Sequence, residues 1–161
     1  MFSFFCPDMI VEGVVDLTLA RLESLGVESL LLDVDCTLKR YGSVQLLAGV
    51  SDWLVSMKEA KIGLYLVSNG GGSRIKKFAE SIQIPYVAPA LKPFPFAIRS
   101  VIRTMNFKKK STAIVGDQLF TDILAGKFAA IKTILVRPHG EDEEPWFARL
   151  KRPIEKLFIK R

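Results

Sequence analysis

The sequence predicts a three-layer α/β domain in which helices cover both faces of an open, parallel sheet. Short apolar runs alternate along the chain with longer segments of helical periodicity. Such alternation is typical of strands joined by crossover helices, and these connections make a sheet parallel. The 161 residues fit a single domain over 1–161, and a 49% hydrophobic content suffices for a core, which excludes a disordered chain.

Five apolar runs are expected to form strands, and four periodic segments are expected to form the helices between them. Strands buried on both faces are largely apolar, and so are the runs at 29–33, 62–67, 84–87, 112–116 and 132–136. Helices are expected over 46–60, 73–81, 94–105 and 119–129. The first of them places one apolar face at helical spacing, made of Leu46, Val50, Trp53, Leu54 and Met57.

The net charge of +6 is concentrated near the C-terminus. Residues 149–161 hold six basic side chains and one acidic one, so the body of the chain is almost neutral. Nucleic-acid-binding proteins more often carry basic side chains on the body, and no nucleic-acid partner is expected. The tail over 145–161 is predicted to be a basic amphipathic helix, and residues 1–5 form an aromatic start. Either end could contact an anionic membrane, whereas the tail could equally pack on the sheet or remain solvated.

Cysteine content and the N-terminal sequence favour a reducing compartment. Two cysteines cannot form a secreted disulfide framework, and the first 20 residues lack the Lys or Arg of a secretory signal. No apolar run reaches the roughly 18 residues of a membrane-spanning helix. The expected location is the cytoplasm, with peripheral contact at the inner membrane face left open. His139 lies in a linker and is predicted to be an exposed loop residue.

Polar side chains follow four of the predicted strands, at the edge where open parallel sheets bind their ligands. Asp33 and Asp35 lie two positions apart on an extended chain, so their carboxylates point the same way and repel unless a cation or proton intervenes. The other segments are the glycine-rich 68–73, Lys92, and Asp117 with Asp122. Each segment alone has a simpler interpretation. The acid pair could be an acidic loop, the glycines a flexible turn, Lys92 a surface residue, and Asp122 an acid that favours a helix N-terminus.

Taken together, the four segments resemble the motifs of the haloacid dehalogenase-like (HAD) phosphatases. The diagnostic residues are Asp33-x-Asp35-x-Thr37 and Gly116-Asp117-x-x-x-Thr121-Asp122, with Ser68-Asn69 and Lys92-Pro93 between them. Nearly the whole chain is also similar to the YqeG-type subgroup, which includes phosphatidylglycerophosphate phosphatases. Cys36 departs from that pattern, because asparagine is more common at its position.

This resemblance implies hydrolysis of a phosphate ester through a covalent intermediate. Asp33 would attack phosphorus, and Asp35 would protonate the leaving oxygen and then deprotonate the attacking water. The implied cofactor is Mg²⁺, held by the Asp33 and Asp117 carboxylates and the Asp35 backbone carbonyl. Lys92 would pair with the phosphoryl group and Asp33 as charge moves.

The remaining motif residues are implied to hold or orient the substrate. Ser68 and the backbone N–H of Asn69 would bind phosphoryl oxygens together with Lys92. Thr37 belongs to the same substrate-binding set, and it is also expected to orient groups of the site together with Asp122.

The short segments between the motifs leave no room for a cap domain. One helix and one strand, with their loops, fill each interval. An uncapped site is open to bulky substrates, and the leading interpretation is a phosphatase of phosphatidylglycerophosphate. A soluble sugar phosphate or a nucleic-acid end is the alternative substrate, and a non-catalytic phosphate-binding scaffold is a third interpretation.

Overall fold

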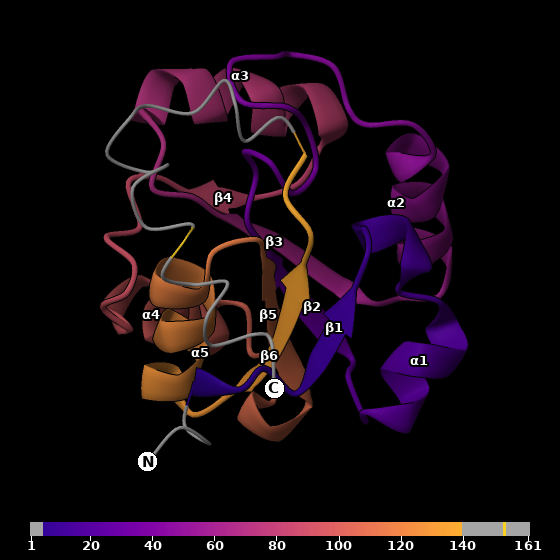
Figure 1. Cartoon of the computed structure of the whole chain (residues 1–161), viewed down its shortest axis with the longest axis vertical. Coiled ribbons are helices and arrows are strands. Elements are labelled where there is room, and N and C mark those ends of the chain that lie inside the picture. The colour runs from indigo at the N-terminus through magenta and orange to yellow at the C-terminus, as the bar shows by residue number, and fades with distance from the viewer. Residues whose placement is uncertain (1–4, 140–152, 154–161) are drawn as a thin grey trace.

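Six parallel strands form one sheet in the order β1-β6-β5-β2-β3-β4 (Figure 1). The structure is a computed structural model, and it describes residues 5–139 and residue 153. The strands are β1 (Met9–Val11), β2 (Ser29–Leu32), β3 (Gly63–Val67), β4 (Tyr86–Val87), β5 (Thr112–Gly116) and β6 (Lys132–Val136). All neighbouring strands pair in parallel, which confirms the predicted class of sheet.

Helices cover both faces of the sheet, so the three predicted layers are present. The helices are α1 (Leu19–Ser24), α2 (Val50–Glu59), α3 (Gly72–Ile82), α4 (Phe96–Thr104) and α5 (Leu124–Ala129). Successive side chains of a strand point to opposite faces. Leu30 and Leu32 therefore pack with α1, α2 and α3, whereas Leu31 packs with α4 and α5. Figure 1 shows α1 and α2 on one side of the sheet and α4 and α5 on the other.

The strand register brings the carboxyl ends of the central strands to one edge. Leu32, the last residue of β2, pairs with Leu66 of β3 and Val115 of β5. The chain therefore leaves these three strands at nearly the same height. Between β2 and β3 the only helix is α2, and between β3 and β4 it is α3, so this described part of the chain holds no cap domain, as predicted.

The beginning of the chain forms elements that the sequence pattern did not predict. Strand β1 adds an edge beside β6, and a 3₁₀ turn, η2 (Val14–Asp16), and α1 follow it. Three residues are too few to show a strand period. Tertiary bonds hold β1 instead, because the Asp8 carboxylate accepts the backbone N–H of Thr133 at 2.8 Å and its hydroxyl at 2.7 Å.

The helix predicted over 119–129 begins with a π-helical turn, η4 (Leu119–Ile123), and continues as α5. π turns inside helices are frequent at functional sites. His139 is exposed, as predicted. Within the described ranges, no helix combines the length and the apolar composition that crossing a membrane requires. The predicted tail helix over 145–161 and residues 1–4 of the aromatic start lie outside the described residues, apart from residue 153.

Helix α5 approaches the sheet so closely that Gly126 has no room for a side chain. A Cβ atom there would lie 2.5 Å from the Cγ2 atoms of both Ile114 and Thr133, which are fully buried. We expect Gly126→Ala to lower the free energy of unfolding by about 1–3 kcal/mol, because overpacking outweighs the gain in helix propensity.

Gly71→Ala is the matched control, because nothing lies within 4 Å of the position its Cβ would take. Urea denaturation of the two variants measures the difference. Equal stabilities would contradict the packing argument.

Candidate active site

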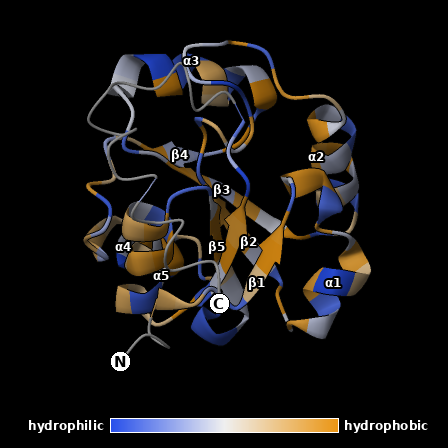
Figure 2. Ribbon diagram, viewed as in Figure 1, coloured by the Kyte–Doolittle hydropathy of each residue, from blue (hydrophilic) through white to orange (hydrophobic). Residues whose placement is uncertain are grey.

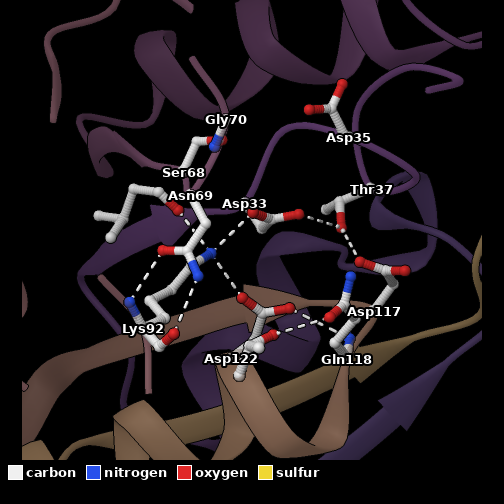
Figure 3. A network of polar contacts seen from close by, with 12 residues as sticks. Asp33, Asp35, Thr37, Ser68, Asn69, Gly70, Lys92, Asp117, Gln118 and Asp122 are labelled. Atoms are coloured by element: carbon white, nitrogen blue, oxygen red, sulfur yellow. Dashed lines mark hydrogen bonds and ion pairs between the residues drawn. The ribbon is translucent and has the colours of Figure 1, made fainter. Parts of the chain in front are cut away.

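Side chains from four segments meet beyond the carboxyl ends of the central strands (Figure 3). Asp33 and Thr37 follow β2, Asp117 follows β5, Asp122 lies in the π turn, and Lys92 lies between β4 and α4. Each of the five residues exposes 8% of its surface or less. The fold therefore places four ionisable groups in a space that contains little water.

The ammonium group of Lys92 lies at the centre of the hydrogen bonds in this site. Its Nζ donates to Asp33 Oδ1 at 2.7 Å, to Asp122 Oδ1 at 2.6 Å and to the carbonyl oxygen of Val67 at 2.7 Å. These acceptors use all the N–H donors of a lysine. Burial alone would lower the pKa of Lys92, but Asp122 and Asp33 outweigh burial and raise that pKa above its usual value. Lys92 therefore carries its positive charge at neutral pH.

Asp122 reaches Lys92 because the strand beside it ends in a glycine. Its carboxyl group lies against Gly116, at a place where a Cβ atom on Gly116 would collide with it. Its other oxygen, Oδ2, accepts the backbone N–H of Gln118 at 3.1 Å, which holds the first residues of the π turn. The Gly116-Asp117 motif therefore needs glycine at position 116, because a side chain there would collide with Asp122.

Three carboxylates share the buried space with this one ammonium group. Oxygen atoms of Asp33, Asp117 and Asp122 all lie within 4.8 Å of one another, and these three residues form the acid cluster. The Thr37 hydroxyl lies 3.4 Å from Asp33 Oδ2 and 3.3 Å from Asp117 Oδ1. When all three acids are ionised, Lys92 leaves two negative charges uncompensated. Carboxylate oxygens are the ligands that Mg²⁺ prefers, so the donor set fits a divalent cation of this kind.

Asp33 titrates differently from an exposed aspartate. Burial raises the pKa of Asp33 to about 7 although Lys92 opposes the rise, and the nearby negative charge of Asp122 adds to it. Without a metal ion, the carboxyl group therefore holds a proton over much of the acidic range. A cation that binds Asp33 must displace this proton.

The loop after β3 is tied to the loop of Lys92 by one amide side chain. Asn69 Oδ1 accepts the backbone N–H of Lys92 at 2.8 Å, and Asn69 Nδ2 donates to the carbonyl oxygen of Lys92 at 2.9 Å. Ser68 Oγ accepts the backbone N–H of Gly70 at 3.0 Å, which closes the turn that follows β3. The sequence interpretation gave both residues to the phosphoryl group and missed this structural role.

Asp35 turns its carboxyl group away from the acid cluster (Figure 3). Arg74 of α3 donates to both oxygens, from Nη1 to Oδ1 at 2.8 Å and from Nη2 to Oδ2 at 2.7 Å. Lys39 Nζ donates to Oδ1 at 2.6 Å. Burial would raise the pKa of Asp35, but the bonds to Arg74 and Lys39 outweigh burial and hold that pKa below its usual value. Neither cation was among the residues singled out from the sequence.

Comparison with known proteins identifies the family. A family model described as HAD-hydrolase-like matches residues 90–154. The chain is 33% identical to a probable phosphatase of Bacillus subtilis, YqeG, over 98% of this chain and 91% of that protein. The chain therefore belongs to the HAD-like phosphatases, a family of hydrolases.

Solved structures share its fold. The NagD protein of Escherichia coli K-12 superposes with a TM-score of 0.56 over 68% of this chain and 87% of its own, at 15% identity. The putative HAD-hydrolase YfnB of Bacillus subtilis, solved with bound magnesium, has a TM-score of 0.50 over 64% of this chain and 48% of its own, at 25% identity. These likenesses confirm the predicted Rossmann-like, HAD-type fold.

Proton release and cation binding are coupled at Asp33. Its pKa in the fold, about 7, exceeds its ordinary value near 4, so the metal-free fold loses stability from this residue as the pH rises between those values. A divalent cation replaces the proton and binds only the ionised carboxylate. At one fixed MgCl₂ concentration, we therefore expect a larger rise in melting temperature at about pH 8 than at about pH 5.5.

Differential scanning fluorimetry with and without MgCl₂ at each pH measures this difference. Groups that titrate without contacting the cation affect both samples equally, so their contribution cancels. Asp33→Asn is the control, and it should remove most of the pH dependence. Equal rises at the two pH values would contradict the coupling.

Lys39 makes Asp35 important for stability as well. The Lys39 side chain is 1% exposed, and its ammonium group pairs with Asp35 and lies over the ring of Phe78. Removing one partner of a buried ion pair costs about 3–5 kcal/mol, so Asp35→Ala should destabilise the fold by about 3 kcal/mol. Adding Lys39→Met should restore most of this loss, because the uncompensated charge is then gone. Chemical denaturation of both single variants and the double variant measures the coupling, and strictly additive losses would refute it.

Proposed function

We propose that the chain is a Mg²⁺-dependent phosphomonoesterase that forms an aspartyl-phosphate on Asp33. The observation that carries the proposal is the setting of the Asp33 carboxylate, which is buried between Lys92 and Thr37 beside two further acids. A carboxylate in this setting is a nucleophile held next to a fixed ammonium group and a cation-binding cluster. Membership of a phosphatase family supports the same chemistry.

The reaction has two steps on the same carboxylate. In the first, an Asp33 oxygen attacks phosphorus and the bond from phosphorus to the ester oxygen breaks. Asp35, which takes up a proton from water once its carboxyl group has left Arg74 and Lys39, gives that proton to the ester oxygen. In the second, Asp35 takes a proton from water, whose oxygen attacks phosphorus and displaces Asp33, so inorganic phosphate leaves. Asp35 reaches the reacting atoms only when its carboxyl group turns from Arg74 and Lys39 toward the acid cluster.

Positive charge has to balance an acid cluster that receives a phosphate dianion. The ion would be held by the Asp33 and Asp117 carboxylates and the Asp35 backbone carbonyl, and when bound it supplies the charge that offsets repulsion between Asp33 and the phosphate. The magnesium in the YfnB structure supports this choice of ion. Ser68 and the Asn69 backbone N–H would hold phosphoryl oxygens, while Thr37 and Asp122 orient the groups beside them.

For the substrate we propose phosphatidylglycerophosphate, which would be converted to phosphatidylglycerol. The described chain has no cap domain between β2 and β4, and an uncapped site accepts a phosphate on a bulky group. The sequence resemblance to the YqeG-type subgroup favours this lipid over a soluble sugar phosphate or a nucleic-acid end. Such a substrate would place the enzyme in the cytoplasm, bound peripherally to the inner face of a membrane.

Phosphate release from a panel of esters tests the nucleophile, the ion and the substrate. We expect phosphatidylglycerophosphate in detergent micelles to be hydrolysed faster than glucose 6-phosphate or a 5′-phosphorylated oligonucleotide. Chelation should abolish activity and Mg²⁺ should restore it. Asp33→Asn should lower turnover by roughly a thousandfold or more while the circular dichroism spectrum stays unchanged.

Each outcome bears on one part of the proposal. Substantial turnover by folded Asp33→Asn would show that Asp33 is not the nucleophile. Activity that survives thorough chelation would show that the reaction does not need a divalent cation. Hydrolysis of a soluble ester, without hydrolysis of the lipid, would rule out the proposed substrate but would still be consistent with the proposed reaction mechanism.

A further inference from the structure

An exposed apolar patch lies in the loop that carries Lys92. Leu91, Phe94 and Phe96 expose 65%, 59% and 71% of their surfaces, and these three residues form the lysine-loop patch. The rings of Phe94 and Phe96 stack, with centroids 6.2 Å apart and planes 15° apart. The loop between β4 and α4 lies at the left edge of the molecule in Figure 1 and carries hydrophobic colour in Figure 2. A cluster of large apolar side chains exposed to solvent is typical of a surface that binds a ligand, another protein or a membrane.

The lysine-loop patch belongs to the loop whose Lys92 side chain reaches the reacting carboxylate. Leu91 has φ +55°, a left-handed conformation that leucine rarely adopts, and it is exposed while the next residue, Lys92, is buried. The amide of Asn69 holds both backbone polar groups of Lys92, whose Nζ lies 2.7 Å from Asp33. The rings of Pro93 and Pro95 restrict the backbone that follows. A surface that binds the patch is therefore held next to the loop segment that carries Lys92.

The segment that carries the patch contains no acidic side chain. Residues 91–116 contain six charged side chains, and all of them are Lys or Arg. Apart from the buried Lys92 they are exposed: Arg99, Arg103, Lys108, Lys109 and Lys110. Arg99 and Arg103 follow Phe96 by three and seven positions on α4, so they lie on the same side of that helix as Phe96. The segment as a whole combines exposed aromatic rings with cations spread over a helix and its following turn.

We propose that the lysine-loop patch and the exposed cations of α4 bind the surface of an anionic lipid bilayer. Stacked aromatic rings are suited to the boundary between headgroups and acyl chains, and cations are attracted to anionic headgroups. This orientation would present Lys92 and Asp33 to a phosphate that projects from the bilayer. The inference rests on the proposed lipid substrate, and it adds the surface by which the enzyme reaches that substrate.

Vesicle binding tests the surface directly. We expect the full chain to co-sediment with vesicles of phosphatidylcholine and phosphatidylglycerol, and more weakly with phosphatidylcholine alone. Phe94→Ser/Phe96→Ser should weaken binding to the anionic vesicles at least about tenfold, because the variant lacks the two aromatic rings that would move from water into the bilayer. Arg99→Gln/Arg103→Gln should weaken binding to the anionic vesicles only, and added salt should reduce the difference.

The matched control makes the same polar change on the other side of the sheet. Leu19 of α1 and Val55 of α2 expose 44% and 51% of their surfaces, so Leu19→Ser/Val55→Ser should leave vesicle binding unchanged. Phe94→Ser/Phe96→Ser should also keep the melting temperature and the turnover of p-nitrophenyl phosphate, a small soluble ester. Its hydrolysis of phosphatidylglycerophosphate in vesicles should fall with the loss of binding.

Three results would overturn the docking surface. Phe94→Ser/Phe96→Ser could bind anionic vesicles as tightly as the unchanged chain. It could instead convert a dimer to a monomer in light scattering without changing vesicle binding, which would make the patch an interface between copies. Vesicle binding could also depend on Trp146→Ser/Phe158→Ser in the full chain and not on the patch, which would assign the membrane contact to the tail.

Failure of this inference and failure of the proposed function give different results. Hydrolysis of phosphatidylglycerophosphate in micelles without any vesicle binding would contradict the docking surface and support the proposed substrate. Vesicle binding that depends on the patch, without hydrolysis of any phospholipid, would support the docking surface and contradict the proposed substrate.

Discussion

The buried ammonium group of Lys92 is the interaction on which the rest of the site depends. A charge removed from water is stable only with opposite charge and complete hydrogen bonding. Lys92 obtains both from Asp33, Asp122 and the carbonyl of Val67. These partners come from the chain after β2, the π turn and the end of β3. One lysine therefore fixes the relative positions of three segments, and it still leaves the acid cluster with excess negative charge.

Several local features are costly by themselves and make sense only around Lys92. Gly116 gives up the side-chain packing of a strand end so that Asp122 can lie against it. The first turn before α5 is π-helical, and Asp122 lies in that turn. Leu91 adopts a left-handed conformation directly before the lysine. Strain of this kind persists only where surrounding contacts impose it, and it gathers at functional sites. In this chain Leu91 and the π turn lie on two sides of one ion-pair network.

The sheet could be predicted because β2, β5 and β6 are largely apolar, as burial on both faces requires. Its ligand-binding edge could be predicted because an acid directly follows β2 and β5. Strand β1 could not, since its three residues are held by Asp8 and Thr133, which lie 125 positions apart. The contact of Arg74 with Asp35 depends on where α3 lies over the loop after β2, and no local pattern specifies that. Lys39 was missed because a lysine in a polar loop is normally solvated.

The distribution of charge gives the site an order of events. An anionic phosphate cannot approach three ionised carboxylates whose single internal counter-charge is Lys92. In the proposed reaction the divalent cation would therefore be bound before the phosphate, and it would displace the proton that burial keeps on Asp33. Outside the acid cluster the balance reverses, because Lys39 and Arg74 together exceed the charge of Asp35 by one. A phosphate ester that enters past Asp35 would therefore meet this positive charge before it reaches Asp33, and such an arrangement favours an anionic substrate.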